Sequence, residues 1–228
     1  MSDLPIRYFP LGDAAMSVEF GTIISEELNM KAVALSQAIE VADLPWVIEA
    51  VPAYASTTVF YDPVIVMRTF PELETAFTAV KKVISGLEQG LSEHVPTART
   101  PFIEIPVDFG GDAALDLAFV AENAGLAVDE VIDIFTSSEY RIYMLGFLPG
   151  FAYMGEVDDR IKTPRRDTPR TSVPKGSVGI ADRQTGIYPL RSPGGWQIIG
   201  RTNVELFTPF GSELTLLRAG GRVRFVAI

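Results

Sequence analysis

Two residue types are absent from the sequence or nearly so, and each absence excludes a class of chemistry. The 228 residues include no cysteine and a single histidine, His94. Disulfides, thiolate zinc sites and thiol nucleophiles are therefore excluded, and no pair of histidines can bind a metal. Catalysis would have to use Asp, Glu, Lys, Arg, Tyr, Ser or Thr, and any metal would need the oxygen ligands that suit Mg²⁺.

Long apolar runs are also absent. No stretch approaches the roughly 20 residues of a membrane span, and the first ten residues show neither a basic leader nor an apolar signal core. We expect a cytoplasmic protein without a membrane partner. Its composition, 47% hydrophobic and 21% charged, is typical of a globular chain that can build one large core or two small ones.

Positive charge is scarce overall but concentrated in one segment. The net charge of −10 argues against a nucleic-acid partner, because phosphate binding requires many clustered basic residues. Residues 1–95 carry 5 basic and 13 acidic side chains, and residues 96–228 carry 14 and 16. Within the second part, residues 160–201 hold nine basic side chains against two acidic ones. This basic segment predicts a small anionic ligand or an acidic partner surface.

The first 90 residues predict a small α+β domain. Four short segments are rich in strand-forming residues, namely 6–10, 15–20, 46–51 and 56–61. Ser25 is placed to begin a helix that ends before Pro45, and Phe70-Pro71-Glu72 is placed to begin a second helix after a turn at Asp62-Pro63. The order ββαββα favours a two-layer sandwich.

The rest of the chain predicts a second domain of mainly β structure. Residues 91–100, which include His94, read as a linker before a domain at 101–228. A strand at 102–107 and a helix pair at about 114–137, broken at Gly125, precede short apolar runs between many glycines and prolines. That pattern favours a barrel with long ordered loops. Its expected closing strands are 205–207, 213–217 and 223–228.

Six motifs fall close together between Gly146 and Thr202. They are GFLPGFAY (146–153), PRRDTPR (164–170), VPKGSVGIA (173–181), QTGIYP (184–189), SPGGW (192–196) and IGRT (199–202). With Leu11-Gly12-Asp13, Pro52-Ala53-Tyr54, Tyr61-Asp62-Pro63 and IPVDFGG (105–111), they resemble the allophanate hydrolase subunit 1 family, also called the KipI family or the family of 5-oxoprolinase B subunits. The resemblance covers almost the whole chain. It implies a small α/β domain followed by a cyclophilin-like β-barrel.

The resemblance implies one of two functions. Some members act with a homologous larger subunit, of the allophanate hydrolase subunit 2 or 5-oxoprolinase C type, and with a third protein of the 5-oxoprolinase A type. Together they form an ATP-dependent 5-oxoprolinase, with ATP and Mg²⁺ bound partly by the partner. The alternative is a regulatory protein that inhibits a sensor histidine kinase without turnover. The many glycines favour the enzyme role, whereas Phe135, near which the family usually has a histidine, favours the regulator.

Ligand-binding candidates come from the same motifs. Phe147, Phe151, Tyr153 and Tyr188 would line a pocket for a planar lactam, or simply belong to the core. Arg165, Arg166, Arg170 and Arg201 would bind carboxylate or phosphate oxygens, or pair with acidic residues. Gly194 and Gly195, before Trp196, would let a ligand approach the backbone. The uncharged hydrogen-bonding candidates are Ser177, Gln184, Thr185 and Ser192.

Catalytic candidates are fewer. Lys175 and Arg170 would neutralise a transferring phosphoryl group. Lys175-Gly176-Ser177 is similar to a fragment of a phosphate-binding loop, but the complete GxxxxGK[ST] motif is absent. Asp182, the acidic residue nearest the motifs, is the candidate general base. Because a full set of acid, base and nucleotide groups is missing, we expect the chain to be inactive alone.

Overall fold

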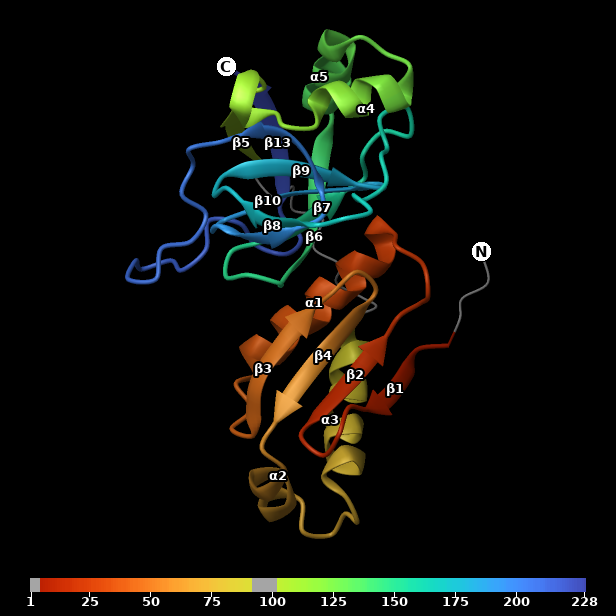
Figure 1. Ribbon diagram of the computed structural model, residues 1–228. Coiled ribbons are helices and arrows are strands. Elements are labelled where there is room, and N and C mark those ends of the chain that lie inside the picture. The colour runs from red at the N-terminus through yellow and green to blue at the C-terminus, as the bar shows by residue number, and fades with distance from the viewer. Residues whose placement is uncertain (1–4, 92–101) are drawn as a thin grey trace. The chain divides into compact units, whose positions relative to one another are not determined.

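The chain divides into two compact units, 1–99 and 100–228. The computed structural model describes residues 5–91 and 102–228 (Figure 1). His94 and all of the expected linker except Leu91, the last residue of a helix, lie outside the described residues. Within the described parts, none of the helices has the length and apolar character that crossing a bilayer requires.

The first unit is a two-layer α+β sandwich. Its antiparallel sheet has the strand order β1-β2-β4-β3, and α1 and α3 lie on one face of it (Figure 1). The core joins Met16 and Val59 of the sheet to Leu35 of α1 and Ile84 of α3. The elements are β1 (Arg7–Pro10), β2 (Ala15–Glu19), α1 (Glu26–Ala42), β3 (Val47–Pro52), β4 (Ser56–Tyr61), α2 (Pro63–Thr69) and α3 (Ala76–Leu91).

The expected turn at Asp62-Pro63 is wrong, because a helix begins there. Asp62 Oδ1 accepts hydrogen bonds from the backbone N–H groups of Val64 (2.8 Å) and Ile65 (3.1 Å), and Pro63 occupies the first turn. A capping aspartate followed by proline is a strong helix start. The following helix then begins at Ala76 instead of near Pro71.

The second unit is built around a nearly closed sheet of seven strands, with the order β12-β9-β10-β7-β6-β13-β5. Asp108 and Arg201 exchange two backbone hydrogen bonds, of 2.8 and 2.9 Å, which link the outer strands β5 and β12. The helical elements are η1 (Gly111–Ala113), α4 (Leu117–Ala124) and α5 (Val128–Ser137). The strands are β5 (Phe102–Val107), β6 (Glu139–Leu145), β7 (Ala152–Gly155), β8 (Arg170–Val173), β9 (Ser177–Ala181), β10 (Gln184–Ile187), β11 (Ser192–Gly194), β12 (Gln197–Arg201) and β13 (Arg222–Ala227).

Only one of the three expected closing strands forms. β13 pairs in parallel with β5 and antiparallel with β6. Residues 205–207 and 213–217 contribute only the isolated bridge between Phe207 and Thr215. The intervening loop closes on itself through hydrogen bonds from Thr208 N to Leu214 O (2.9 Å) and from Leu216 N to Leu206 O (3.0 Å). This segment therefore forms a loop with its own hydrogen bonds instead of two strands of the barrel.

Candidate functional site

The second unit contains a cavity of about 330 Å³. Its lining residues come from four of the motifs, and most of them were predicted to bind a ligand. The loop between β6 and β7, the segment before β8, the residue after β10, and β11 with the turn behind it all reach it. Its lining residues are Phe147, Phe151, Tyr153, Arg165, Arg166, Pro169, Tyr188, Pro193, Gly194, Gly195 and Trp196. We call this cavity the aromatic pocket.

The walls of the aromatic pocket are formed by a cluster of rings centred on Phe151. The Phe151 ring lies edge-to-face with Tyr153 (4.9 Å between centroids), Tyr188 (5.4 Å) and Trp196 (5.5 Å). Edge-to-face packing at these distances is favourable and orients the rings. Phe151, Tyr188 and Trp196 are buried, so they act both as core and as pocket wall.

The ring cluster requires glycine at position 194. A Cβ atom at Gly194 would lie 2.4 Å from Tyr188 Oη, closer than real Cβ atoms approach any atom. At Gly195 the nearest atom would be Pro169 Cγ at 3.5 Å, an ordinary contact. Gly194 therefore serves the packing of Tyr188, whereas the backbone at Gly195 stays open toward the pocket.

Two guanidinium groups border the aromatic pocket. The Arg165 guanidinium lies over the Trp196 ring, 5.9 Å from its centroid. Arg166 donates from Nη1 to Asp116 Oδ1 (3.0 Å), and its backbone N–H donates to Gly195 O (2.8 Å). Its Nε is buried and has no hydrogen-bond partner among the described residues. The pocket thus has a cationic edge formed by Arg165 and Arg166.

Asp116 was not among the residues predicted from the sequence. Its carboxylate is 5% exposed and binds Arg166, Arg170 and the backbone N–H of Ile198, the last at 2.6 Å. Arg170 donates twice to it, at 2.8 and 2.6 Å. The sequence placed Asp116 inside the helix pair expected at about 114–137, whereas α4 begins at Leu117 and the Asp116 side chain caps none of its N–H groups.

The three candidate catalytic residues lie outside the aromatic pocket. Arg170 is bound to Asp116, and the Lys175 Nζ contacts both carboxylate oxygens of Glu205 at 2.8 and 2.6 Å. Asp182 is exposed and bridges to Thr163 through its backbone, with φ of +54°. Arg201 also lies elsewhere and donates to the backbone oxygen of Asp112 (3.0 Å).

The uncharged candidates belong to the strands around the pocket and are not among its lining residues. Thr185 is buried and donates to Gly179 O (3.0 Å), and Ser192 donates to Pro193 O (3.1 Å). Ser177 is buried, and its Oγ has no partner among the described residues. Gln184 pairs through β10 with both β7 and β9.

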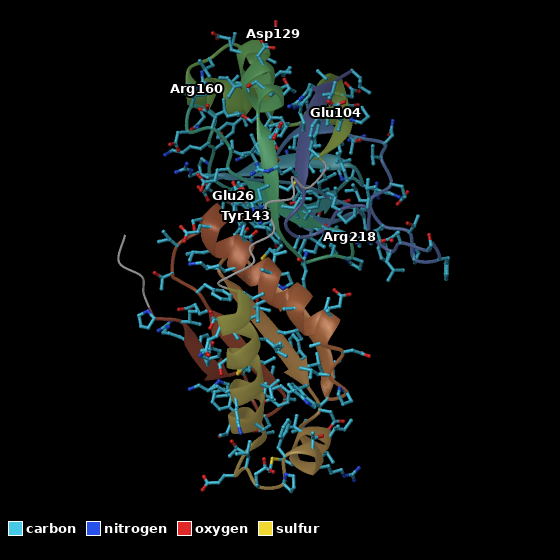
Figure 2. All side chains as sticks on the ribbon, turned by 180° about the vertical axis from the view of Figure 1, so that it is seen from behind. Glu26, Glu104, Asp129, Tyr143, Arg160 and Arg218 are labelled. Carbon is cyan, nitrogen blue, oxygen red and sulfur yellow. The ribbon has the colours of Figure 1, made fainter. Side chains whose placement is uncertain are left out.

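Most of the remaining basic segment forms surface ion pairs. Arg160 binds Asp158 with Nη2 to Oδ2 at 2.8 Å, and Arg183 binds Glu156 with Nη2 to Oε2 at 2.5 Å. Arg160, like Arg218 outside the segment, lies at the periphery of the second unit (Figure 2). Of the four arginines proposed to bind an anion, Arg165 and Arg166 alone reach the aromatic pocket in the described chain.

Comparison with known proteins decides the family. Residues 6–217 match the family described as carboxyltransferase domain, subdomain C and D. The chain belongs to this family. It is 45% identical to the B subunit of 5-oxoprolinase from Bacillus subtilis (strain 168), covering 96% of this chain and 91% of that protein. It is 40% identical to the B subunit of 5-oxoprolinase from Escherichia coli O157:H7, covering 96% and 95%.

A solved structure of the same fold belongs to a longer chain. The crystal structure of TTHA0988 matches with a TM-score of 0.79 and 36% identity, covering 98% of this chain and 40% of that one. The present chain therefore spans less than half the length of that protein. These comparisons confirm both the resemblance to the family of 5-oxoprolinase B subunits and the expected fold class.

Phe135, the residue to which the family resemblance drew attention, lies in the main core of the second unit. It is fully buried, and its ring stacks on Phe225 (4.8 Å) and packs against Tyr140 (5.1 Å). It does not line the aromatic pocket. Phe135 is therefore a core residue of the barrel and not part of the pocket.

The aromatic pocket offers ring faces and guanidinium groups but little acid–base chemistry. Burial raises the pKa of the Tyr188 phenol, so this group stays protonated near neutral pH. Among the described lining residues there is no Asp, Glu, Lys or His. The pocket of this family member therefore suits a small planar anion and lacks an evident general base.

Proposed function

We propose that the chain is the B-type subunit of an ATP-dependent 5-oxoprolinase. With a homologous larger subunit of the C type, it would form a joint site that activates the lactam of 5-oxoproline for cleavage to glutamate. The similarity to two 5-oxoprolinase B subunits supports this role. The observation that carries it is the aromatic pocket, whose ring walls meet the guanidinium groups of Arg165 and Arg166.

The chemistry of 5-oxoproline matches this pocket. Its lactam ring is small and nearly flat, and aromatic side chains would contact its faces. Its carboxylate is an acceptor for guanidinium donors, and Arg165 and Arg166 both line the pocket. The cavity of about 330 Å³ lies within one unit and holds a ligand of this size. We therefore infer that the chain alone binds the ligand.

A joint site follows from what the aromatic pocket lacks. Opening an unstrained lactam is slow. ATP would transfer its γ-phosphoryl group to the lactam oxygen and release ADP, and water would then add to the activated carbon and break the ring C–N bond. A second water would release phosphate from the resulting acyl phosphate to give glutamate. The phosphoryl transfer needs cations and a base close to the reacting atoms. The companion proteins, of the C type and the A type, would supply them. In TTHA0988 the equivalent fold is likewise part of a longer chain.

Catalysis by Lys175, Arg170 and Asp182 stays a prediction. Lys175 would have to exchange Glu205 for a phosphoryl group, and Arg170 would have to leave Asp116. Mg²⁺ would accompany ATP, yet the described residues contain no group of three or more acidic or histidine side chains that could hold it. The described residues therefore do not form an Mg²⁺ site.

Calorimetric titration of the full chain tests the ligand. We expect Arg166→Ala to weaken 5-oxo-L-proline binding by about 1.5–3 kcal/mol, the range for hydrogen bonds to charged groups. Binding of 2-pyrrolidinone, the same lactam without the carboxylate, should not change. Arg191→Ala, in the same basic segment but outside the pocket, is the matched control. Equal 5-oxoproline affinity for Arg166→Ala and Arg191→Ala would contradict the proposal.

A further inference from the structure

Phe147 combines two unfavourable features at the aromatic pocket. Its φ is +71°, in the left-handed region that bulky side chains avoid. Its side chain is also 61% exposed to solvent. Glycine or asparagine would adopt this conformation at lower cost, and the chain does use glycine three residues later, at Gly150, where φ is +81°. Strain of this kind points to a functional contact.

The loop around Phe147 is held in place by its own hydrogen bonds. Gly146 N donates to Phe151 O (3.1 Å), Leu148 N to Gly146 O (2.9 Å) and Phe151 N to Leu148 O (2.9 Å). The loop also packs against the chain at Leu206, because a Cβ atom at Gly150 would lie 3.0 Å from Leu206 O. The left-handed conformation of Phe147 is therefore imposed by its surroundings.

The Phe147 ring stands as a wall of the pocket. It meets Phe151 at 5.5 Å and 87°, and Tyr188 at 6.5 Å and 89°. Both partners are buried, whereas most of the Phe147 ring remains exposed. The buried cluster thus anchors one edge of the ring and leaves the rest free for another contact.

We propose that Phe147 is a ligand-binding residue whose ring covers the flat face of a small lactam held in the aromatic pocket. The strained backbone places the ring at this position. The choice of a lactam as ligand rests on the proposed function, whereas the covering role rests on the geometry of Phe147. The ring contacts the lactam and not its carboxylate, so its contribution should not depend on the ligand's charge.

Fluorescence of Trp196 provides the test. The sequence has two tryptophans, so Trp46→Phe leaves Trp196, in the pocket wall, as the reporter. We expect Phe147→Gly to weaken the binding of 5-oxo-L-proline and of 2-pyrrolidinone to the same extent. The affinity for each should fall by roughly 3- to 10-fold, the effect of losing one aromatic contact. Phe147→Tyr should bind as wild type does. Calorimetry without the Trp46 substitution gives the same comparison if that variant folds poorly.

The stability of the same variants separates binding from folding. Because Phe147→Gly removes strain along with the ring, its melting temperature should not fall below that of wild type. Phe210→Gly is the matched control, since Phe210 is a fully exposed phenylalanine in the loop between β12 and β13, which extends away from the sheet (Figure 1). It should leave the affinity for both ligands unchanged.

Three results would overturn the assignment of Phe147. Unchanged affinity in Phe147→Gly would show that the ring does not cover the ligand. A lowered melting temperature together with lost binding would show a structural role. Unchanged ligand affinity with weakened assembly with a companion protein would show an interface contact. Failure of wild type to bind either lactam would instead contradict the proposed function, and the ligand assigned to Phe147 with it.

Discussion

The carboxylate of Asp116 holds the guanidinium of Arg170 in a two-point ion pair, with N–O distances of 2.8 and 2.6 Å. The same carboxylate accepts hydrogen bonds from Arg166 and from the backbone of Ile198. One buried residue before α4 therefore fastens the arginine-rich segment 164–170 to β12. The position of the cationic edge of the aromatic pocket depends on it.

Removing this carboxylate should be costly. Asp116→Ala would leave two partly buried guanidinium groups without their counter-ion, and we expect a loss of about 3–5 kcal/mol in the free energy of unfolding. Urea denaturation measures it. Asp158→Ala, which breaks the surface pair with Arg160, should cost no more than about 1 kcal/mol. Similar losses in the two variants would show that Asp116 is not a structural anchor.

The two adjacent glycines of the aromatic pocket should respond differently to alanine. Gly194→Ala places a Cβ atom 2.4 Å from Tyr188 Oη, so Tyr188 or the backbone must move. We expect a destabilisation of about 1–3 kcal/mol, typical of overpacking. Gly195→Ala meets only an ordinary contact at 3.5 Å and should fold as wild type does. Thermal melting of both variants tests this difference. Equal melting temperatures for Gly194→Ala and Gly195→Ala would refute the packing role of Gly194.

Local signals explain what could be predicted from the sequence. Alternating strand formers and the cap at Ser25 are properties of short segments, and the structure has Ser25 Oγ accepting from Leu28 N. The sequence predicts a turn at Asp62-Pro63 because aspartate and proline are common in turns as well as at helix starts. The structure has a helix there. The partner of Arg170 could not be foreseen, because Asp116 is 54 residues away and only the tertiary fold joins them. Likewise, the pairing of Lys175 with Glu205 is a tertiary contact.

Alkaline pH should destabilise the first unit through Tyr8. Burial, and next the charge and hydrogen bond of Glu88, raise the pKa of Tyr8 from 10.0 to about 12. The phenol therefore ionises more readily in the unfolded chain, so its contribution to stability is complete below pH 10 and is lost as the pH rises toward 12. Denaturation measured between these pH values should show that Tyr8→Phe loses less unfolding free energy than wild type does. An identical loss would contradict the assignment.

The second unit should fold without the first. It contains its own core, which joins Ile105 and Phe225 of the barrel to Phe135 of α5. We predict that a polypeptide beginning at Thr97 gives a β-rich circular dichroism spectrum and one cooperative melt. The full chain is the reference for the spectrum. An aggregated or unfolded product would show that the two units depend on a common core.

Reconstitution of activity tests the joint site most directly. The measurement is 5-oxoproline-dependent ATP hydrolysis by the purified chain, alone and mixed with companion proteins of the A and C types. We predict no turnover by the chain alone, because the described lining residues of its aromatic pocket include no Asp, Glu, Lys or His that could act as a base. We predict turnover once the companions are added. In that mixture Arg166→Ala should lower the rate and Arg191→Ala should not. Robust 5-oxoproline-dependent hydrolysis by the chain alone would contradict the joint site.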